Sequence, residues 1–266
     1  MTDIVGVEWQ GEHVAHVILN RPDKKNAMSL EMFAALPETA AKLAGSGPLR
    51  AVILRGAGGD FCAGLDLGVM QALAGRLDEV RAEMLDPGAG EIANFYQRPV
   101  TCWQDLRAPV IAAIDGVCFG AGMQLALAAD FRIAAPGARF SIMEARWGLI
   151  PDMGITQSLP KLLRADQAKE LIMTARVLDA AEALAFGLIT RVAEDPFGAA
   201  RDLAEELSAR SPDAVQAAKR LVDRGWHLQA DKALKLEAEL QAAIIGRPNQ
   251  IEAVMANLQK RAPDFI

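Results

Sequence analysis

The sequence predicts an α/β fold with a helical C-terminal part, and three observations lead to this prediction. Apolar runs with strand character alternate with helical patterns early in the chain, and later segments are helical alone. The 266 residues are 52% hydrophobic, enough for one large domain or a core with an appendage. The pattern changes near Asp195-Pro196. We therefore expect a core over residues 1–195 and a helical region over residues 196–266.

Short apolar segments bounded by turn residues predict the strands of the core. The first two flank the turn Gln10-Gly11-Glu12, which indicates a hairpin. A fully apolar run at Val110–Ile114 is typical of a strand buried on both faces. The predicted strands are residues 4–9, 13–19, 49–54, 110–114, 131–134 and 139–142.

Helical spacing of apolar residues predicts the helices. Ser29 is a suitable N-cap for the first helix, with Met32, Leu36 and Leu43 at helical spacing behind it. Ser211-Pro212 opens a later one, since serine caps and proline fits the first turn. The other predicted helices are residues 66–106 (interrupted at 86–90), 120–129, 156–163, 165–174, 180–186, 196–209, 228–245 and 249–259.

Composition argues against several classes of function. The net charge of −6 comes without a basic block, so we expect no nucleic-acid partner. No apolar run reaches the roughly 20 residues that span a bilayer, so we expect no membrane insertion. The segment Met1 to Ile4 lacks a signal-peptide pattern, which predicts a cytoplasmic protein. We expect no metal site, because the cysteines and histidines lack ligand spacing; they are Cys62, Cys102, Cys118, His13, His16 and His227.

The stretch Gly120-Ala121-Gly122-Met123-Gln124 is the most informative in the chain. It follows the buried strand and starts a predicted helix. Small residues there expose backbone N–H groups, and a helix start adds positive potential. This combination suits a developing negative charge. Close helix packing is the alternative explanation.

Several segments in a fixed order together resemble the crotonase superfamily, also called the enoyl-CoA hydratase/isomerase family. Each is a weak pattern alone, but four in the right order make the resemblance strong. They are Asn20-Arg21-Pro22 with Asn26-Ala27, then Phe61-Cys62-Ala63-Gly64-Leu65-Asp66-Leu67, then Ile114-Asp115-Gly116 through Asp130, and then Glu144 to Gly154; Thr174-Ala175-Arg176 with Ala180 to Val192 resembles the segment that closes the family's core.

The resemblance implies a spiral of ββα units and a C-terminal region that builds homotrimers, often paired as hexamers. It implies an acyl thioester of coenzyme A as substrate and no other cofactor. Two backbone N–H groups, at Leu65 and Ala121, would bind the thioester oxygen. Alanine stands at 121 where the family usually has glycine, but a backbone donor tolerates that change.

The resemblance also implies a coenzyme A site near Lys24, Ala27, Ala63 and Asp66. Asp66 has a second explanation as the cap of the following helix, which we favour over a catalytic role. Lys24 is equally well explained as a solvated loop lysine.

The carboxylates decide the reaction. Hydratases of this family place two glutamates around one water, and here Gln124 stands at the first position and Glu144 at the second. An amide exchanges no proton at neutral pH, so Gln124 orients a neighbour. Asp152 lies eight residues after Glu144, as in the dienoyl-CoA isomerase branch, whose further aspartate is also replaced by Gln124. We expect Glu144 and Asp152 to move a proton along the acyl chain.

Three alternatives remain open. Hydration of a trans-2-enoyl-CoA needs Glu144, alone or with Asp152, to place the water. A homologue that binds acyl-CoA without catalysis would explain the changes at Ala121 and Gln124. Structural roles are also open: Glu144 as a surface carboxylate paired with an arginine (Arg139 or Arg146), and Asp152 as a helix cap.

Overall fold

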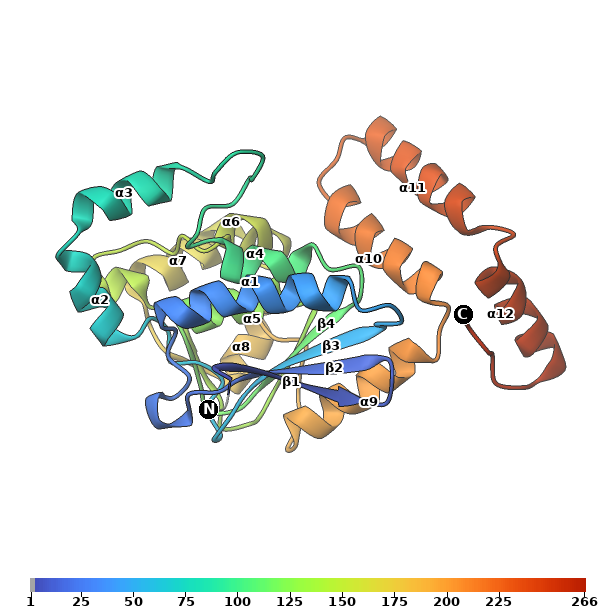
Figure 1. Cartoon of the computed structure of the whole chain (residues 1–266), viewed down its shortest axis with the longest axis horizontal. Helices are drawn as coiled ribbons and strands as arrows, with labels where there is room; N and C mark the ends of the chain where they lie inside the picture. Colours follow the sequence, from blue (N-terminus) through green and yellow to red (C-terminus); the bar gives the residue numbers. More distant parts are fainter. Residues whose placement is uncertain (1–2) are drawn as a thin grey trace.

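The computed structural model describes residues 3–266 and shows a mixed α/β molecule, as the sequence predicts (Figure 1). Part of the segment considered for a signal pattern, Met1 to Ile4, lies outside these residues. The strands are β1 Val5–Gln10, β2 Val14–Leu19, β3 Ala51–Gly56, β4 Val110–Ile114, β5 Val117–Phe119, β6 Phe131–Ala134, β7 Arg139–Ser141, β8 Leu178–Asp179 and β9 Arg191–Val192.

Helices cover the sheet and form the C-terminal part. The short 3-10 helices are η1 Pro22–Lys24, η2 Glu144–Trp147 and η3 Leu159–Lys161. The α-helices are α1 Leu30–Ala44, α2 Leu67–Ala74, α3 Leu77–Leu85, α4 Arg98–Gln104, α5 Ala121–Ala128, α6 Ile155–Ser158, α7 Ala165–Thr174, α8 Ala180–Phe186, α9 Pro196–Ser208, α10 Pro212–Gly225, α11 Ala230–Ile244 and α12 Pro248–Gln259.

The larger sheet has the strand order β1-β2-β3-β4-β6-β9 and is parallel except for the β1–β2 hairpin. Its central strands are buried on both faces. In β3, Val52 and Leu54 join the main apolar core, whereas Ala51 and Ile53 pack on the other face against α9. The smaller sheet has the strand order β5-β7-β8. Its first strand, β5, lies between β4 and α5 in the chain.

A loop after β3 runs beside β5 and so brings the two predicted oxyanion segments together. Cys62 N donates to Val117 O over 3.0 Å, and Phe119 N donates to Cys62 O over 2.9 Å. These bonds form a parallel bridge between Cys62 and Cys118, both fully buried. Three residues past Cys62 is Leu65, and α5 begins two residues after Phe119. The pairing therefore places both donors at one end of the small sheet.

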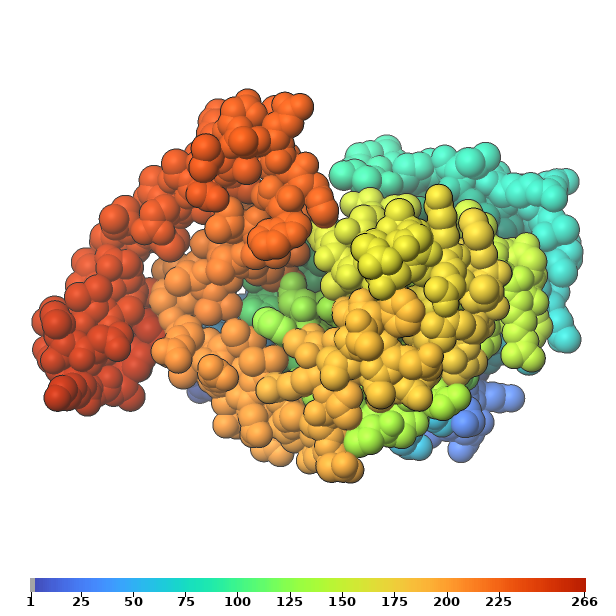
Figure 2. Space-filling model, turned by 180° about the vertical axis from the view of Figure 1, so that it is seen from behind, coloured from blue at the N-terminus to red at the C-terminus, as the bar shows by residue number. Residues whose placement is uncertain are grey.

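The C-terminal helices divide into one that covers the sheet and three that leave it. α9 packs on β3, β4 and β6, on the face opposite α1 (Figure 1). Beyond it, α10, α11 and α12 project from the body as an arm (Figure 2). The predicted region 196–266 thus contains both kinds of helix. Within residues 3–266, none of the helices is long and apolar enough to span a membrane.

The differences from the predicted elements have local causes. The predicted helical stretch over residues 66–106 is interrupted at residues 86–90 as expected, since α3 ends at Leu85, although the loop extends to Gln97. Its first part is wrong as one helix, because a turn at Gly75-Arg76 separates α2 from α3. The predicted helix at 156–163 is also wrong: α6 ends at Ser158 and η3, with Pro160 in its first turn, continues the chain. β5, β8 and β9 have two or three residues each and were not predicted, since such strands depend on distant partners.

Candidate active site

Two backbone N–H groups without acceptors lie close together where the loop after β3 meets α5. Met28 N donates to Gly64 O over 2.8 Å, and Asp66 N donates to Met28 O over 3.0 Å. This parallel bridge leaves the intervening Leu65 N–H directed away from Met28. Ala121 begins α5, where an N–H has no intrahelical acceptor. Within residues 3–266 neither amide donates a hydrogen bond, so both can serve an oxyanion.

Two glycines allow the close approach of these loops. Gly64 has φ +98°, and a Cβ added there would lie 3.0 Å from Phe119 O and 3.8 Å from Ala121 N. Gly120 has φ +51°, and a Cβ added there would lie 3.5 Å from Glu144 Oε1. Both conformations disfavour other residues. The same geometry shows that the amides and the Glu144 carboxylate occupy one site.

A cavity of about 480 Å³ lies in front of the amides. Met70, Met143, Trp147 and Leu149 supply an apolar wall, and Trp147 is 49% exposed. Apart from Gln124 and Asp152, the predicted site residues all line it: Lys24, Ala27, Ala63, Leu65, Asp66, Ala121 and Glu144. The structure therefore brings together, in one cavity, segments that are up to 120 residues apart in the chain.

Glu144 presents one engaged and one free carboxylate oxygen. Its Oε1 accepts a hydrogen bond of 2.7 Å from Gln124 Nε2, whereas Oε2 is buried without a partner. Burial raises the pKa of Glu144, the Gln124 hydrogen bond lowers it, and the charge of Asp152 raises it. The alternative of a surface carboxylate paired with an arginine is wrong, since Glu144 forms no ion pair within residues 3–266. A carboxylate held this way can accept a proton at Oε2.

Gln124 lies behind Glu144 on α5 and is 1% exposed. Besides its bond to Glu144, its Oε1 accepts a hydrogen bond of 2.8 Å from Met153 N. Both ends of the amide are therefore satisfied, as a buried polar group requires. The expectation that Gln124 orients a neighbour agrees with this geometry.

Asp152 lies near Glu144 but does not line the cavity. Its side chain retains solvent exposure, yet the surrounding protein raises the pKa of its carboxyl by desolvation. The alternative role as a helix cap is wrong. α6 begins at Ile155, its N-cap is Gly154, and no side chain caps it. Asp152 therefore does not cap α6, and its charge acts on Glu144.

The residues predicted near coenzyme A form one rim of the cavity, and Arg21 holds that rim together. Asp66 caps α2 by accepting 2.8 Å from Gly68 N, as favoured from the sequence, and it pairs with Arg21 at 2.8 Å. The Arg21 hydrogen bond lowers the pKa of Asp66. Arg21 Nη1 also donates to Ala27 O. No local pattern predicts this bracing role, because Asp66 lies 45 residues away in the chain.

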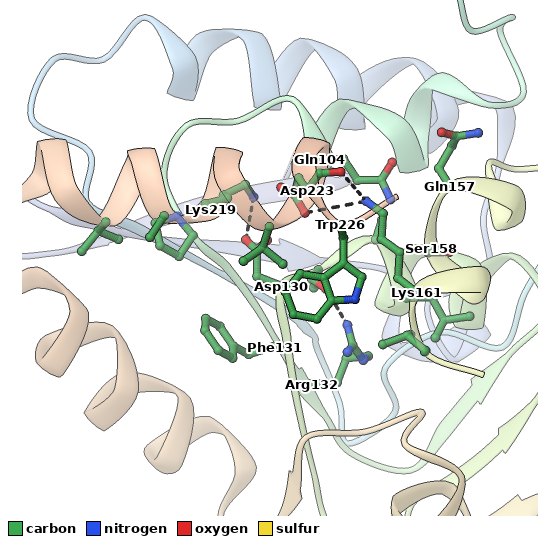
Figure 3. Close-up of a pocket in the computed structure, with 18 of the residues that line it drawn as sticks. Gln104, Asp130, Phe131, Arg132, Gln157, Ser158, Lys161, Lys219, Asp223 and Trp226 are labelled. Carbon is green, nitrogen blue, oxygen red and sulfur yellow. Dashed lines mark hydrogen bonds and ion pairs between the residues drawn. The ribbon is translucent and has the colours of Figure 1, made fainter. Parts of the chain in front are cut away.

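A second cavity, of about 520 Å³, lies between α10 and the core and contains none of the predicted site residues (Figure 3). Two ion pairs connect α10 with the core beside it. Lys219 Nζ lies 2.6 Å from Asp130 Oδ2, and Lys161 Nζ lies 3.8 Å from Asp223 Oδ1. This cavity is larger than the one at the amides, but the two free N–H groups and Glu144 lie elsewhere.

Comparisons with known proteins agree with this arrangement. The family model described as enoyl-CoA hydratase/isomerase matches residues 10–266. Methylglutaconyl-CoA hydratase from Mus musculus is 34% identical over 97% of this chain and 81% of its own length. A Delta(3,5)-Delta(2,4)-dienoyl-CoA isomerase from Arabidopsis thaliana is 33% identical over 95% of this chain and 92% of its own length.

Solved structures agree equally well. The crystal structure of enoyl-CoA hydratase from Bacillus anthracis superposes with a TM-score of 0.89 at 32% identity, covering 99% of each chain. The expected crotonase fold is thereby confirmed. With a family model that spans nearly the whole sequence and relatives of both kinds, the chain belongs to the enoyl-CoA hydratase/isomerase family of the crotonase superfamily.

Proposed function

We propose that this enzyme moves a double bond along the acyl chain of an enoyl- or dienoyl-CoA thioester. One observation carries the proposal: beside two free amides stands a carboxylate, Glu144, whose Oε2 is buried and unengaged, and its neighbour on α5 is an amide. The position that would complete a pair of carboxylates around a water is held by Gln124, which transfers no proton. A double-bond shift needs a base and an acid but no water.

The proposed reaction uses two proton positions. Glu144 Oε2 takes a proton from the α-carbon, and the electrons of that C–H bond move into the thioester carbonyl to give an enolate. The N–H groups of Leu65 and Ala121 bind the enolate oxygen, and each such donor contributes about 3–4 kcal/mol to the barrier reduction. Asp152 then gives a proton to the far end of the conjugated system. The carbonyl re-forms as the double bond shifts.

The proposal also includes how coenzyme A binds, how the chains assemble and where the protein is located. Lys24, Ala27, Ala63 and Asp66 hold the coenzyme A portion, and coenzyme A enters as part of the substrate, with no other cofactor. The chain assembles as a homotrimer or a pair of trimers through the C-terminal helices. A cytoplasmic location stays a prediction, as does the absence of nucleic-acid and membrane partners.

Hydration of a trans-2-enoyl-CoA is the second candidate. It is favoured by Glu144, which lines the cavity and has one oxygen without a hydrogen-bond partner, and by the hydratase among the relatives. A homologue that binds acyl-CoA without catalysis is a third, and the retained carboxylates argue against it.

Proton NMR in heavy water with a panel of enoyl- and dienoyl-CoA thioesters separates these candidates. Isomerisation moves the double bond and places deuterium at the α and distal carbons. Hydration consumes the conjugated double bond, and a binder does neither. Glu144→Gln should lower turnover at least 100-fold, within the range of general acid–base catalysis. Glu38→Gln, on the exposed face of α1, is the matched control. Unchanged turnover in Glu144→Gln would overturn the role of Glu144.

A further inference from the structure

Gln124 occupies the point where α5 approaches both carboxylate-bearing segments. It lies three residues after Ala121, so one helix carries an oxyanion donor and this amide on the same side. Its carboxamide reaches η2, which begins at Glu144, and the turn before α6, which contains Asp152 and Met153. Both contacts are shorter than 2.9 Å, and the side chain is 99% buried from solvent.

The Met153 N–H fixes the direction of the amide. A backbone N–H only donates, so it requires the carbonyl oxygen of Gln124. The amide NH₂ must then face Glu144 Oε1, which it does at 2.7 Å. A rotated amide would set NH₂ against N–H and lose both bonds. The hydrogen-bond network therefore allows one orientation alone.

This single orientation determines what each neighbour can do. Glu144 Oε1 accepts a hydrogen bond from Gln124, whereas Oε2 has no hydrogen-bond partner. Proton transfer is therefore assigned to Oε2. The peptide that follows Asp152 is held by the same amide through Met153 N. Moving Gln124 would therefore shift Glu144, Asp152 or both relative to the oxyanion donors.

We infer that Gln124 is a positioning residue that sets the separation of the two proton-carrying carboxylates and thereby selects which carbon of the acyl chain receives the proton. The inference rests on the proposed isomerisation for its catalytic consequence. Its structural part, the hold on Glu144 and on the turn of Asp152, does not depend on any reaction. Gln124 itself takes no proton.

Two variants of Gln124 test its hydrogen bond to Glu144 separately from its hydrogen bond to Met153. Gln124→Met has similar volume and removes both hydrogen bonds. Gln124→Glu keeps an acceptor for Met153 N and places a second carboxyl group against Glu144 Oε1 in place of the amide donor. In heavy water we expect Gln124→Met to lower the ratio of distal to α deuterium incorporation by about tenfold or more, because a displacement of about 1 Å in a reacting group can cost on the order of 100-fold. Gln124→Glu should retain more of the wild-type ratio, since the Asp152 turn stays held. A loss confined to stability would slow both exchanges equally and leave the ratio unchanged, and that result would overturn the inference.

A titration independent of turnover separates this inference from the proposed function. Carbon-13 NMR of the Glu144 carboxyl reports its pKa in the free protein. Among the titratable groups of residues 3–266, Asp152 is the one whose charge raises the pKa of Glu144. Gln124→Met removes the amide donor and should move the Glu144 titration to higher pH, even if the wild type isomerises nothing. Gln124→Glu should move it further, because a second carboxyl group then lies against Glu144. Coincident titrations in the wild type and both variants would refute the hold on Glu144. Gln241→Met, an exposed amide on α11, is the control for changing a glutamine elsewhere.

Discussion

At the scale of single residues, glycines decide how closely the loops of the site can pack. A Cβ added to Gly122 would lie 2.5 Å from Cys62 O and 2.6 Å from Cys62 Cβ, neither of which can move without shifting the bridge to Cys118. Gly122 has an ordinary helical conformation, so its requirement is for space. The close packing of α5 against Cys62 therefore depends on the absence of a Cβ at Gly122.

Gly122→Ala should destabilise the fold by about 1–3 kcal/mol, the usual cost of overpacking a core. Thermal unfolding measures it. Gly137→Ala is the matched control, because a Cβ there meets nothing within 4 Å and the backbone has no positive φ. Equal melting temperatures for the two variants would contradict the packing account.

The pH dependence of turnover also belongs to the residue scale. Burial raises the pKa of Glu144 above the ordinary 4.5, so the carboxylate that accepts a proton forms only at higher pH. Activity should therefore fall as pH decreases through a value above 4.5. The acidic limb of the kcat/KM profile reports this pKa. The residual activity of Glu144→Gln should lack that limb, and an acidic limb at or below 4.5 in the wild type would be inconsistent with the buried carboxylate.

At the scale of elements, α10 is joined to the core by charged pairs and lies beside a cavity. α10 has no fully buried residue, although Lys219 reaches Asp130 with a side chain that is only 8% exposed. Asp130 also accepts 2.7 Å from Val110 N, so it connects α10 to the start of β4. Removing one partner of such a shielded pair leaves the other charge without compensation.

Lys219→Met should loosen α10. We expect faster hydrogen exchange along α10, and a loss of stability of about 1–3 kcal/mol, below the 3–5 typical of fully buried pairs because Asp130 is 18% exposed. Lys235→Met is the control, since its pair with Glu239 is exposed on both sides and surface pairs contribute little. Unaltered exchange in α10 would show that the pair does not hold the helix.

Elements also show what the sequence could predict. The strand at residues 110–114, the helix at residues 120–129 and the strand at residues 131–134 depend on local apolar runs and small residues, and their predicted bounds agree with the structure within a residue, although β5 between the first two was not predicted. Ser29 caps α1 as expected. Distant contacts were out of reach: Gln124 is bound by Met153, 29 residues away, and Asp66 by Arg21. The sequence thus indicated the candidate site residues. The hydrogen-bond partners that orient their side chains could be identified only in the folded structure.

At the scale of the whole molecule, the C-terminal arm (α10 to α12) exposes many large apolar side chains, which is unusual for a protein that stays monomeric. α11 has no buried residue, and several large apolar side chains on the arm are at least half exposed: Trp226, Leu234, Ile245, Ile251 and Leu258. An association of identical chains would cover such a surface.

We expect the wild type to have the mass of a trimer or a hexamer in light scattering coupled to size-exclusion chromatography. Leu258→Glu should shift it toward smaller species, because Leu258 is 74% exposed on α12. Ile92→Glu is the control, since Ile92 is 98% exposed but belongs to the loop after α3 and not to the arm. A monomeric wild type would contradict the proposed assembly.

The N–H groups of Leu65 and Ala121 belong to the main chain, and this has a consequence for how the enzyme can change. Apart from proline, which lacks the N–H and also restricts the backbone, no replacement of either side chain deletes a donor. A conventional alanine scan would therefore pass over the groups on which the proposed chemistry most depends. Replacing the peptide link itself with an ester, by chemical synthesis or an expanded genetic code, is the modification that would silence one donor and leave the shape of the fold in place.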